Sequence, residues 1–317
     1  MGSRLRPHTF TLPKVLLNVA GKPILGHILD HLVESGVTSL SLIVGPMGDL
    51  IERYVRENYK IPAEFILQAQ PKGLGHAVSL GLTKEDKEVL VILGDTVFDL
   101  DLKSVLKNAR ASSIGVKEVE DPRRFGVVET RGEQVVRLVE KPEHPKSNLV
   151  IVGIYLIRNA QALRNCIDLL FERELTTRGE YQLTDALQLM IEQGEEMSTF
   201  PVNAWLDCGK PETMLSTNRY LLNGDSFTLP EPRPGVVFVP PVYVHPETEL
   251  NHCIIGPYAT IGKNAVVADA MVRDSILGEG AVVKNVLIEK SLVGNNAIIK
   301  GDFQQYNVGD SSEISSV

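Results

Sequence analysis

Cysteine, tryptophan and long apolar runs are scarce in this chain of 317 residues. Its three cysteines, Cys166, Cys208 and Cys253, lie far apart with no Cys-x-x-Cys pair, which favours reduced thiols over a zinc site or a disulfide framework. No apolar run approaches the ~18–20 residues of a membrane span, and the N-terminus has no apolar signal-peptide stretch. We therefore expect a soluble, cytoplasmic protein that does not engage a membrane.

A positive net charge is also missing. There are 40 acidic residues against 32 basic ones, a formal net charge of −8, and such a field repels a nucleic-acid backbone. Hydrophobic residues make up 43% and charged residues 23%, which is ordinary globular usage and excludes wholesale disorder. At roughly 100–200 residues per domain, the length predicts two folded domains that do not bind nucleic acid.

The first part of the chain alternates short aliphatic runs with amphipathic stretches. This alternation predicts an α/β fold with a mainly parallel sheet that is buried on both faces. The clearest helix begins after Pro23 and ends near Gly36, because Ile24, Ile28 and Leu32 follow a helical period. Strands are expected at 40–44, 65–67, 89–93, 113–116 and 149–157, an antiparallel ribbon at 125–130 and 134–140, and further helices at 49–59, 102–110, 159–173, 181–192 and 211–222.

The pattern changes after residue 224. A proline-containing polar stretch at 225–235 has the composition of a linker. Beyond it, two sets of aliphatic residues recur every 16 positions, namely Ile261, Leu277, Val293 and Val267, Val283, Ile299. A fixed short period of this kind is typical of a β-helix, and a small β-sandwich with chance spacing is the alternative. We therefore place a first domain at 1–224 and a short β-helix of about four coils at 236–317.

A basic segment without carboxylates opens the chain. No acidic residue precedes Asp30, whereas Arg4, Arg6, Lys14 and Lys22 do. Such a segment suits a polyphosphate pocket. Gly2 and Ser3 would let backbone amides approach phosphate oxygens. On these residues alone, a solvated basic loop is an equal alternative.

The order of the motifs decides between these alternatives. Gly2-Ser3-Arg4-Leu5-Arg6-Pro7 followed by Pro13-Lys14 resembles the signature loop of the sugar-1-phosphate nucleotidyltransferases. Seven further segments match that family in the right order: Gln68 to Ala77, Leu93-Gly94-Asp95, Phe125 to Val128, Glu140-Lys141-Pro142, Val152 to Tyr155, Gly179 to Asp185 and Trp205 to Gly209. The C-terminal repeats resemble the left-handed β-helix found in many members. The resemblance therefore implies a Rossmann-like catalytic domain followed by a left-handed β-helix.

The resemblance also implies roles for individual residues. Arg4 and Lys14 would be catalytic, acting on the α-phosphate and on the phosphates of both substrates, and Asp95 and Asp207 would hold Mg²⁺. The nucleotide would be bound by Gly2, Ser3, Gln68, Gly73 and Asp95, and the sugar phosphate by Gly126, Glu140, Lys141, Val152 and Gly153. The Gln68 amide can both donate and accept, so it suits the N3–H and O4 edge of uracil or thymine. His76 is expected at a helix start, with a structural or ribose-adjacent role and not an acid–base one.

The implied reaction joins a nucleoside triphosphate, dTTP or UTP, to a sugar 1-phosphate, with glucose 1-phosphate the expected partner. One departure from the family pattern concerns the first strand. The family has an apolar strand before the phosphate loop, and here Met1 stands where the loop has begun, so that strand is missing from the sequence. We expect either that the true chain begins upstream or that the protein folds around a missing strand. The alternatives are a mannose-1-phosphate guanylyltransferase, a bifunctional enzyme with an acetyltransferase β-helix, and a non-catalytic regulatory subunit of the same fold. We expect a homo-oligomer, because an open last coil exposes strand edges.

Overall fold

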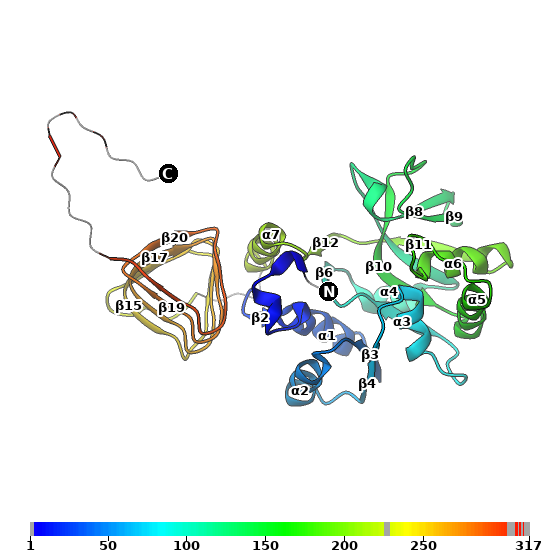
Figure 1. The fold of residues 1–317 in the computed structure, drawn as a ribbon, viewed down its shortest axis with the longest axis horizontal. Coiled ribbons are helices and arrows are strands. Elements are labelled where there is room, and N and C mark those ends of the chain that lie inside the picture. The colour runs from blue at the N-terminus through cyan, green and yellow to red at the C-terminus, as the bar shows by residue number, and fades with distance from the viewer. Residues whose placement is uncertain (1–2, 225–228, 303–307, 310, 312, 314–317) are drawn as a thin grey trace. The chain divides into compact units, whose positions relative to one another are not determined.

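The computed structural model describes residues 3–224, 229–302, 308–309, 311 and 313 (Figure 1). Gly2 and residues 225–228 of the predicted linker therefore lie outside the described residues. The chain divides into two compact units: Met1–Leu17 with Lys22–Thr217, and Asn18–Gly21 with Asn218–Val317.

A six-stranded sheet forms the centre of the first unit. Its strand order is β5 (Val89–Ile92), β10 (Leu149–Ile157), β7 (Ser112–Glu118), β11 (Met197–Pro201), β9 (Gln134–Glu140) and β8 (Gly126–Arg131). Strands β5, β7 and β11 share one direction, whereas β10 runs antiparallel to both β5 and β7. The α/β class and the β8–β9 ribbon are confirmed.

The reversed direction of β10 was not predicted. Eight of its nine residues are buried, so its aliphatic sequence is that of a strand covered on both faces. Burial on both faces produces the same uninterrupted apolar pattern whichever way the strand runs. Direction is fixed by the connections, which hydrophobicity does not reveal.

Two smaller strand pairs complete the first unit. Strands β3 (Leu40–Val44) and β4 (Ala63–Leu67) pair in parallel, and β6 (Thr96–Asp99) pairs antiparallel with β12 (Ala204–Asp207). Among the described residues, neither pair is hydrogen-bonded into the six-stranded sheet.

In the described residues, six helices are present where they were predicted, and one more, α3, was predicted only as a helix start at His76. They are α1 (Ile24–Glu34), α2 (Gly48–Asn58), α3 (Leu74–Gly81), α4 (Leu102–Asn108), α5 (Ala160–Glu172), α6 (Leu183–Glu192) and α7 (Pro211–Leu222), with short 3₁₀ turns η1 (Ser3–Leu5), η2 (His8–Phe10), η3 (Lys14–Leu16) and η4 (Pro122–Arg124). Helix α5 begins where Asn159 Oδ1 accepts a hydrogen bond from Ala162 N at 3.0 Å, an ordinary N-cap. In the described part of the chain, no helix combines the length and apolar character needed to cross a membrane.

Helices α5 and α6 pack with the sheet into the main hydrophobic core. The core includes Ile114 of β7, Leu163 and Ile167 of α5, and Leu187 of α6, all fully buried. Helices α5 and α6 pack against each other, and α6 also contacts β9; all three elements lie on the same side of the first unit in Figure 1. This core supports the sheet whose strand ends carry the candidate site residues.

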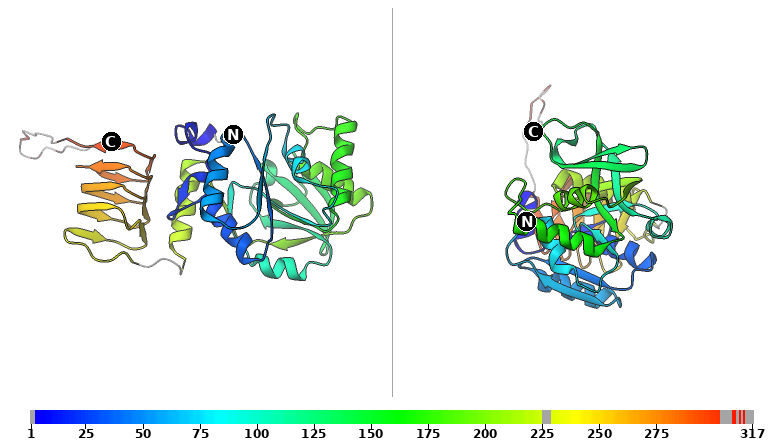
Figure 2. Two further views of the ribbon diagram at one scale, coloured as in Figure 1. Left: turned by 90° about the horizontal axis from the view of Figure 1, so that it is seen from below. Right: turned by 90° about the vertical axis from the view of Figure 1, so that its right-hand side faces the viewer.

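The second unit is a parallel β-helix. Its coils are formed by β13 (Val236–Phe238), β14 (Val242–Val244), β15 (Glu249–Ile255), β16 (Ala259–Ile261), β17 (Val266–Arg273), β18 (Ile276–Leu277), β19 (Val282–Lys284), β20 (Leu287–Glu289), β21 (Leu292–Val293) and β22 (Ile298–Lys300). Two short strands come much earlier in the sequence: β1 (Asn18–Val19) belongs to this second unit, and β2 (Lys22–Pro23) belongs to the first. Figure 2 shows the coils stacked on one another.

The 16-residue repeat is confirmed by the strand register. Leu277 pairs with both Ile261 and Val293 across sequential coils. Val283 pairs in the same way with Val267 and Ile299. Residues with this spacing therefore stack inside the coils, where Ile261, Val267 and Val283 are fully buried.

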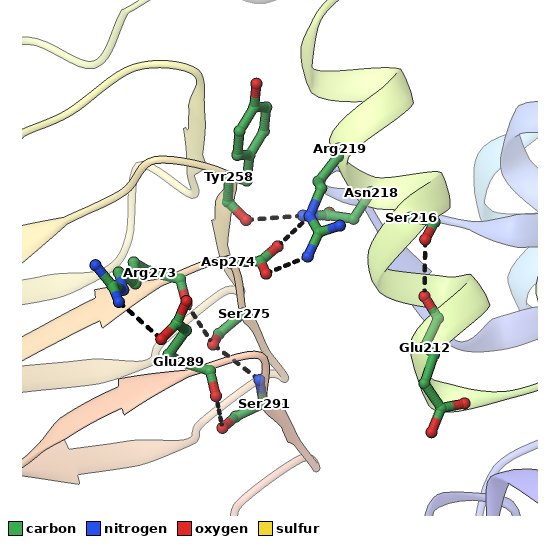
Figure 3. A network of polar contacts seen from close by, with 10 residues as sticks. All are labelled: Glu212, Ser216, Asn218, Arg219, Tyr258, Arg273, Asp274, Ser275, Glu289 and Ser291. Atoms are coloured by element: carbon green, nitrogen blue, oxygen red, sulfur yellow. Dashed lines mark hydrogen bonds and ion pairs between the residues drawn. The ribbon is translucent and has the colours of Figure 1, made fainter.

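Helix α7 ends within this second unit and is attached to the coils by polar contacts (Figure 3). Asn218 Nδ2 donates to the Tyr258 carbonyl at 3.0 Å. The Arg219 guanidinium binds both carboxylate oxygens of Asp274, with Nε 2.6 Å from Oδ1. The Asp274 side chain is only 11% exposed and that of Arg219 is 40% exposed, so the carboxylate is the mostly buried member of this bidentate pair.

Arg219→Met should therefore lower the free energy of unfolding by about 1–3 kcal/mol, because it leaves a mostly buried carboxylate without its partner. Arg273→Met is the matched control: its pair with Glu289 is 52% and 41% exposed, so a change below about 1 kcal/mol is expected. Urea unfolding of the full chain measures both. Equal effects of the two substitutions would contradict the buried role of the Arg219–Asp274 pair.

Candidate active site

Two carboxylates gather at one end of the β6–β12 ribbon. The register pairs Asp207, the last residue of β12, with Thr96, the first residue of β6. Asp95 directly precedes Thr96, so this pairing brings Asp95 and Asp207 to the same edge. The two paired residues, Thr96 and Asp207, are 111 positions (207 − 96) apart in the sequence. Asp95 also follows β5, at the carboxyl end of a strand where ligands of α/β sheets bind.

Lys14 contacts this carboxylate edge directly. Its Nζ lies 2.9 Å from Asp95 Oδ2, and the Lys14 side chain is only 13% exposed while that of Asp95 is 50% exposed. Lys14 begins η3, just after the buried Pro13, which fixes the direction in which the chain enters the site. The structure thus brings together a predicted catalytic cation and a predicted metal ligand.

Arg4 approaches the same edge from η1. A Cβ atom at Gly209 would lie 2.8 Å from Asp207 Oδ1 and 3.1 Å from Arg4 Nη2. The carboxylate of Asp207 and the guanidinium of Arg4 therefore flank Gly209. Because Gly209 has no side chain, the Asp207 carboxylate and the Arg4 guanidinium occupy the space that its Cβ would fill. Gly2 lies outside the described residues, and Ser3 is described by its backbone alone.

Beneath this edge lies a buried thiol. Burial raises the pKa of Cys208 to about 11, and its Sγ lies 3.6 Å from Thr217 Oγ1. The charges of Lys14, Asp207 and Asp95 also act on it, Lys14 opposing the increase. A thiol with this pKa is protonated near neutrality and is a packing group, not a nucleophile.

A second group of predicted residues surrounds Glu140. Its Oε2 accepts a hydrogen bond from Thr184 Oγ1 at 2.7 Å, and its Oε1 pairs with Lys141 Nζ at 2.9 Å. A Cβ at Gly126 would lie 3.2 Å from both Glu140 Oε2 and Thr184 Oγ1. Burial, together with the Glu140 charge, raises the pKa of Asp185 in the same motif. Thr184 was not predicted as a site residue; its place in the Leu183-Thr184-Asp185 motif was the available signal.

Lys141 has an unusual backbone conformation, with φ of +45°. Non-glycine residues in this region are uncommon and occur often at functional sites. Its N–H donates to the Phe125 carbonyl at 3.0 Å, and its own carbonyl accepts from Arg178 Nη2 at 3.1 Å. The neighbouring chain therefore holds this lysine in a strained position beside Glu140.

Val152 and Gly153 belong to the β10 strand. The Val152 side chain is 2% exposed, so only its main chain can reach a ligand. Gly153 has φ of +84° and lies where the β10–β7 register shifts between Ile151 and Tyr155. A Cβ there would meet Leu93 at 2.7 Å, so the fold itself requires this glycine.

The predicted nucleobase residues lie after β4. Gln68 N donates to the Val44 carbonyl at 2.9 Å, which anchors the residue beside the end of β3. The following loop contacts Tyr181: Tyr181 N donates to Lys72 O at 2.9 Å, and Gly75 N donates to Tyr181 O at 2.8 Å. These two hydrogen bonds fix the loop against Tyr181.

Gly73 is required by this loop for a reason the sequence did not reveal. Its φ is +108°, and a Cβ would lie 2.5 Å from Tyr181 O and 2.8 Å from Tyr181 N. The family resemblance assigned Gly73 to nucleotide binding. The structure adds a packing reason, since the Tyr181 backbone already occupies the space of a side chain.

Trp205 carries an unpaired donor that sequence reasoning did not single out. Its Nε1 is buried and has no hydrogen-bond partner among the described residues. The indole packs edge-on against Phe125, with ring centroids 4.9 Å apart. Phe125 precedes Gly126, so this donor lies beside the loop predicted to bind the sugar.

Residues 1–224 match the nucleotidyl transferase family. The chain belongs to this family. The resemblance to sugar-1-phosphate nucleotidyltransferases drawn from the sequence motifs is thereby confirmed. Together with the parallel β-helix, it accounts for both parts of the expected fold.

Several proteins are similar to this one. Bifunctional protein GlmU of Methanocaldococcus jannaschii is 39% identical over 224 residues, which is 70% of this chain and 52% of that protein. UTP–glucose-1-phosphate uridylyltransferase AglF of Haloferax volcanii is 34% identical over 220 residues, 67% of this chain and 88% of that one. The chain thus spans about half the length of the GlmU relative and most of AglF.

A solved structure agrees with the fold of this nucleotidyl transferase family member. A Bacillus anthracis protein assigned as a glucose-1-phosphate thymidylyltransferase, crystallised with sucrose, aligns with a TM-score of 0.62 and 25% identity, covering 72% of this chain and 94% of that one.

Gly73→Ala should destabilise the protein more than Gly194→Ala. Both glycines have positive φ, but nothing lies within 4 Å of a Cβ at Gly194. The control should therefore lose about 1 kcal/mol from conformation alone, while Gly73→Ala should lose a further ~1–3 kcal/mol from the collision with Tyr181. Thermal unfolding of both variants tests this. Equal losses would show that the loop moves away from Tyr181 without cost.

Proposed function

We propose that the chain transfers a uridylyl or thymidylyl group from UTP or dTTP to a sugar 1-phosphate, with glucose 1-phosphate the expected acceptor. The observation that carries the proposal is the meeting of Arg4, Lys14, Asp95 and Asp207 at one edge. The names of two similar proteins support it: one is a UTP–glucose-1-phosphate uridylyltransferase and the other is assigned as a glucose-1-phosphate thymidylyltransferase.

In the proposed reaction, an oxygen of the sugar 1-phosphate attacks the α-phosphorus of the triphosphate. A new P–O bond forms as the bond from the α-phosphorus to the bridging oxygen breaks, and pyrophosphate leaves. Both reactants are anions, so the protein has to neutralise charge and align the two groups, and no protein nucleophile is needed. Arg4 and Lys14 provide the positive charge where the phosphates meet.

Asp95 and Asp207 fit a magnesium ion. Both are carboxylates, the hard oxygen donors that Mg²⁺ prefers, and half of the Asp95 side chain is open to solvent. Within the described residues there is no group of three or more His, Cys, Asp or Glu side chains placed to hold a metal. Mg²⁺ commonly takes one or two carboxylates and completes its shell with water and substrate phosphates. When bound, the ion would supply charge stabilisation to the reacting phosphates.

The sugar 1-phosphate would bind between Lys141 and Trp205. The ammonium group of Lys141 suits its phosphate, while Glu140 accepts from hydroxyl groups. The unpartnered Trp205 Nε1, buried beside Phe125, is a donor that a sugar oxygen could satisfy. These groups together present both donors and acceptors, as a polyhydroxylated ligand requires.

We also propose that the chain forms a homo-oligomer through its β-helix. The coil register aligns Val237, Ile254, Met271 and Leu287 in a row. Val237 is 56% and Leu287 76% exposed at the two ends of that row. Ile254 and Met271 between them are partly buried. A row of apolar side chains that is exposed at both ends favours association.

The nucleotide choice tests the proposal directly. With glucose 1-phosphate as acceptor, UTP and dTTP should release pyrophosphate, and ATP and GTP should be at least about tenfold worse in kcat/KM, because their base edges leave the pocket's polar groups unpaired. The same panel with mannose 1-phosphate separates the guanylyltransferase alternative. GTP as the best substrate would contradict the proposal, and no turnover with any triphosphate would favour the regulatory-subunit alternative.

The metal assignment has its own test. Asp95→Asn and Asp207→Asn should each lower kcat by about 10²-fold or more, because a ligand is lost where charge develops in the transition state. Asp99→Asn, at the other end of β6, is the matched control and should retain normal turnover. Mg²⁺-dependent pyrophosphate release from folded variants gives the comparison. A variant at either ligand position with wild-type kcat would place the metal elsewhere.

A further inference from the structure

The side-chain amide of Gln68 is held on one side by two acceptors. Its Nε2 donates to the Gly73 carbonyl at 3.2 Å and lies 2.9 Å from His76 Nδ1. A carbonyl oxygen only accepts, so the amide nitrogen, and not its oxygen, must face Gly73. Both Nε2 hydrogens are then directed toward the protein, so the amide cannot also donate to O4 of uracil or thymine, as the sequence led us to expect.

The orientation of this amide also fixes the state of His76. Because Gln68 Nε2 is a donor, His76 Nδ1 must accept, and the ring proton must therefore be on Nε2 of the imidazole. Burial and the positive charge of Lys72 both lower the pKa of His76, which favours this neutral ring near pH 7. The ring is further held beside Phe171, with centroids 6.1 Å apart.

One polar atom of the amide is left for a ligand. Among the described residues, no hydrogen bond engages Gln68 Oε1. We propose that His76 is a positioning residue for nucleobase selection, which together with Gly73 O locks the Gln68 amide so that it presents an acceptor. The inference rests on the proposed function, in which Gln68 contacts the base.

A locked acceptor distinguishes pyrimidines by a single proton. Uracil and thymine carry a hydrogen on N3 that can donate to Oε1. Cytosine has a lone pair at N3, so two acceptors would face each other. An amide free to rotate could accommodate either base, whereas one held by His76 selects uracil and thymine against cytosine.

Two substitutions separate the Nδ1 acceptor from the ring. His76→Phe keeps an aromatic ring beside Phe171 but removes the acceptor, and His76→Asn retains an acceptor because Oδ1 is bonded to Cγ as Nδ1 is. KM and kcat are measured for UTP and CTP, with dTTP and dCTP in parallel. His76→Phe removes one hydrogen bond to Gln68, so KM for UTP should rise about tenfold and the preference for UTP over CTP should fall by a similar factor. The kcat for UTP should stay within about twofold of wild type. His76→Asn should restore most of the preference.

A UTP preference that survives His76→Phe, or is lost equally in His76→Asn, would overturn the inference. Failure of the proposed function looks different, because the wild-type chain would then turn over neither UTP nor dTTP. A second measurement requires no variant: nitrogen NMR of histidine-labelled full-length protein reports which ring nitrogen carries the proton. We expect the proton on Nε2 of His76 at neutral pH, and a proton on Nδ1 would overturn the lock even if His76→Phe failed to fold.

Discussion

The antiparallel pairing of β6 with β12 is the constraint on which the candidate active site depends. It joins a segment just after β5 to one just before α7, and its register sets Asp207 opposite Thr96. Without that pairing, Asp95 and Asp207 would be isolated acidic residues at the ends of two short strands. With it, they form an edge that Lys14 and Arg4 reach from the first residues of the chain.

The same edge explains why the opening of the chain is basic. Lys14 is mostly buried and pairs with Asp95, so the carboxylate compensates its charge inside the protein. A largely buried ammonium with one partner can exchange that carboxylate for phosphate oxygens when an anionic ligand arrives. The ion pair therefore holds the Lys14 ammonium at the carboxylate edge, in the position that the proposed reaction requires.

Much of the fold was predictable from the sequence. Strands β3 and β10 and helix α7 have the predicted limits, because each has a strong apolar pattern or clear end residues. The β-helix was predictable because stacking repeats the same aliphatic positions every 16 residues. Strands β6 and β12 were not predicted: each has four residues, and their pairing across the chain, not their local hydrophobicity, makes them strands.

The site was predictable only in part, for a related reason. Motif order placed Lys14 and Asp95 in one pocket, yet it did not show that they bind each other. The motif order assigned Gly73 to ligand binding. It did not show that the Tyr181 backbone lies where a side chain at Gly73 would be. Glu140 contacts Thr184 of α6, and Gln68 contacts His76 of α3. Each partner lies on a different element, so these contacts appear only once the fold is known.

A crystal structure of the full chain with Mg²⁺ and a non-hydrolysable UTP analogue would test the central claim, that β6 and β12 build a phosphate and metal site, most directly. We expect a metal ion about 2.0–2.1 Å from carboxylate oxygens of Asp95 and Asp207, with Lys14 Nζ moved from Asp95 to a phosphate oxygen. A metal bound away from these two carboxylates, or a triphosphate bound with the Lys14–Asp95 pair unchanged, would contradict it.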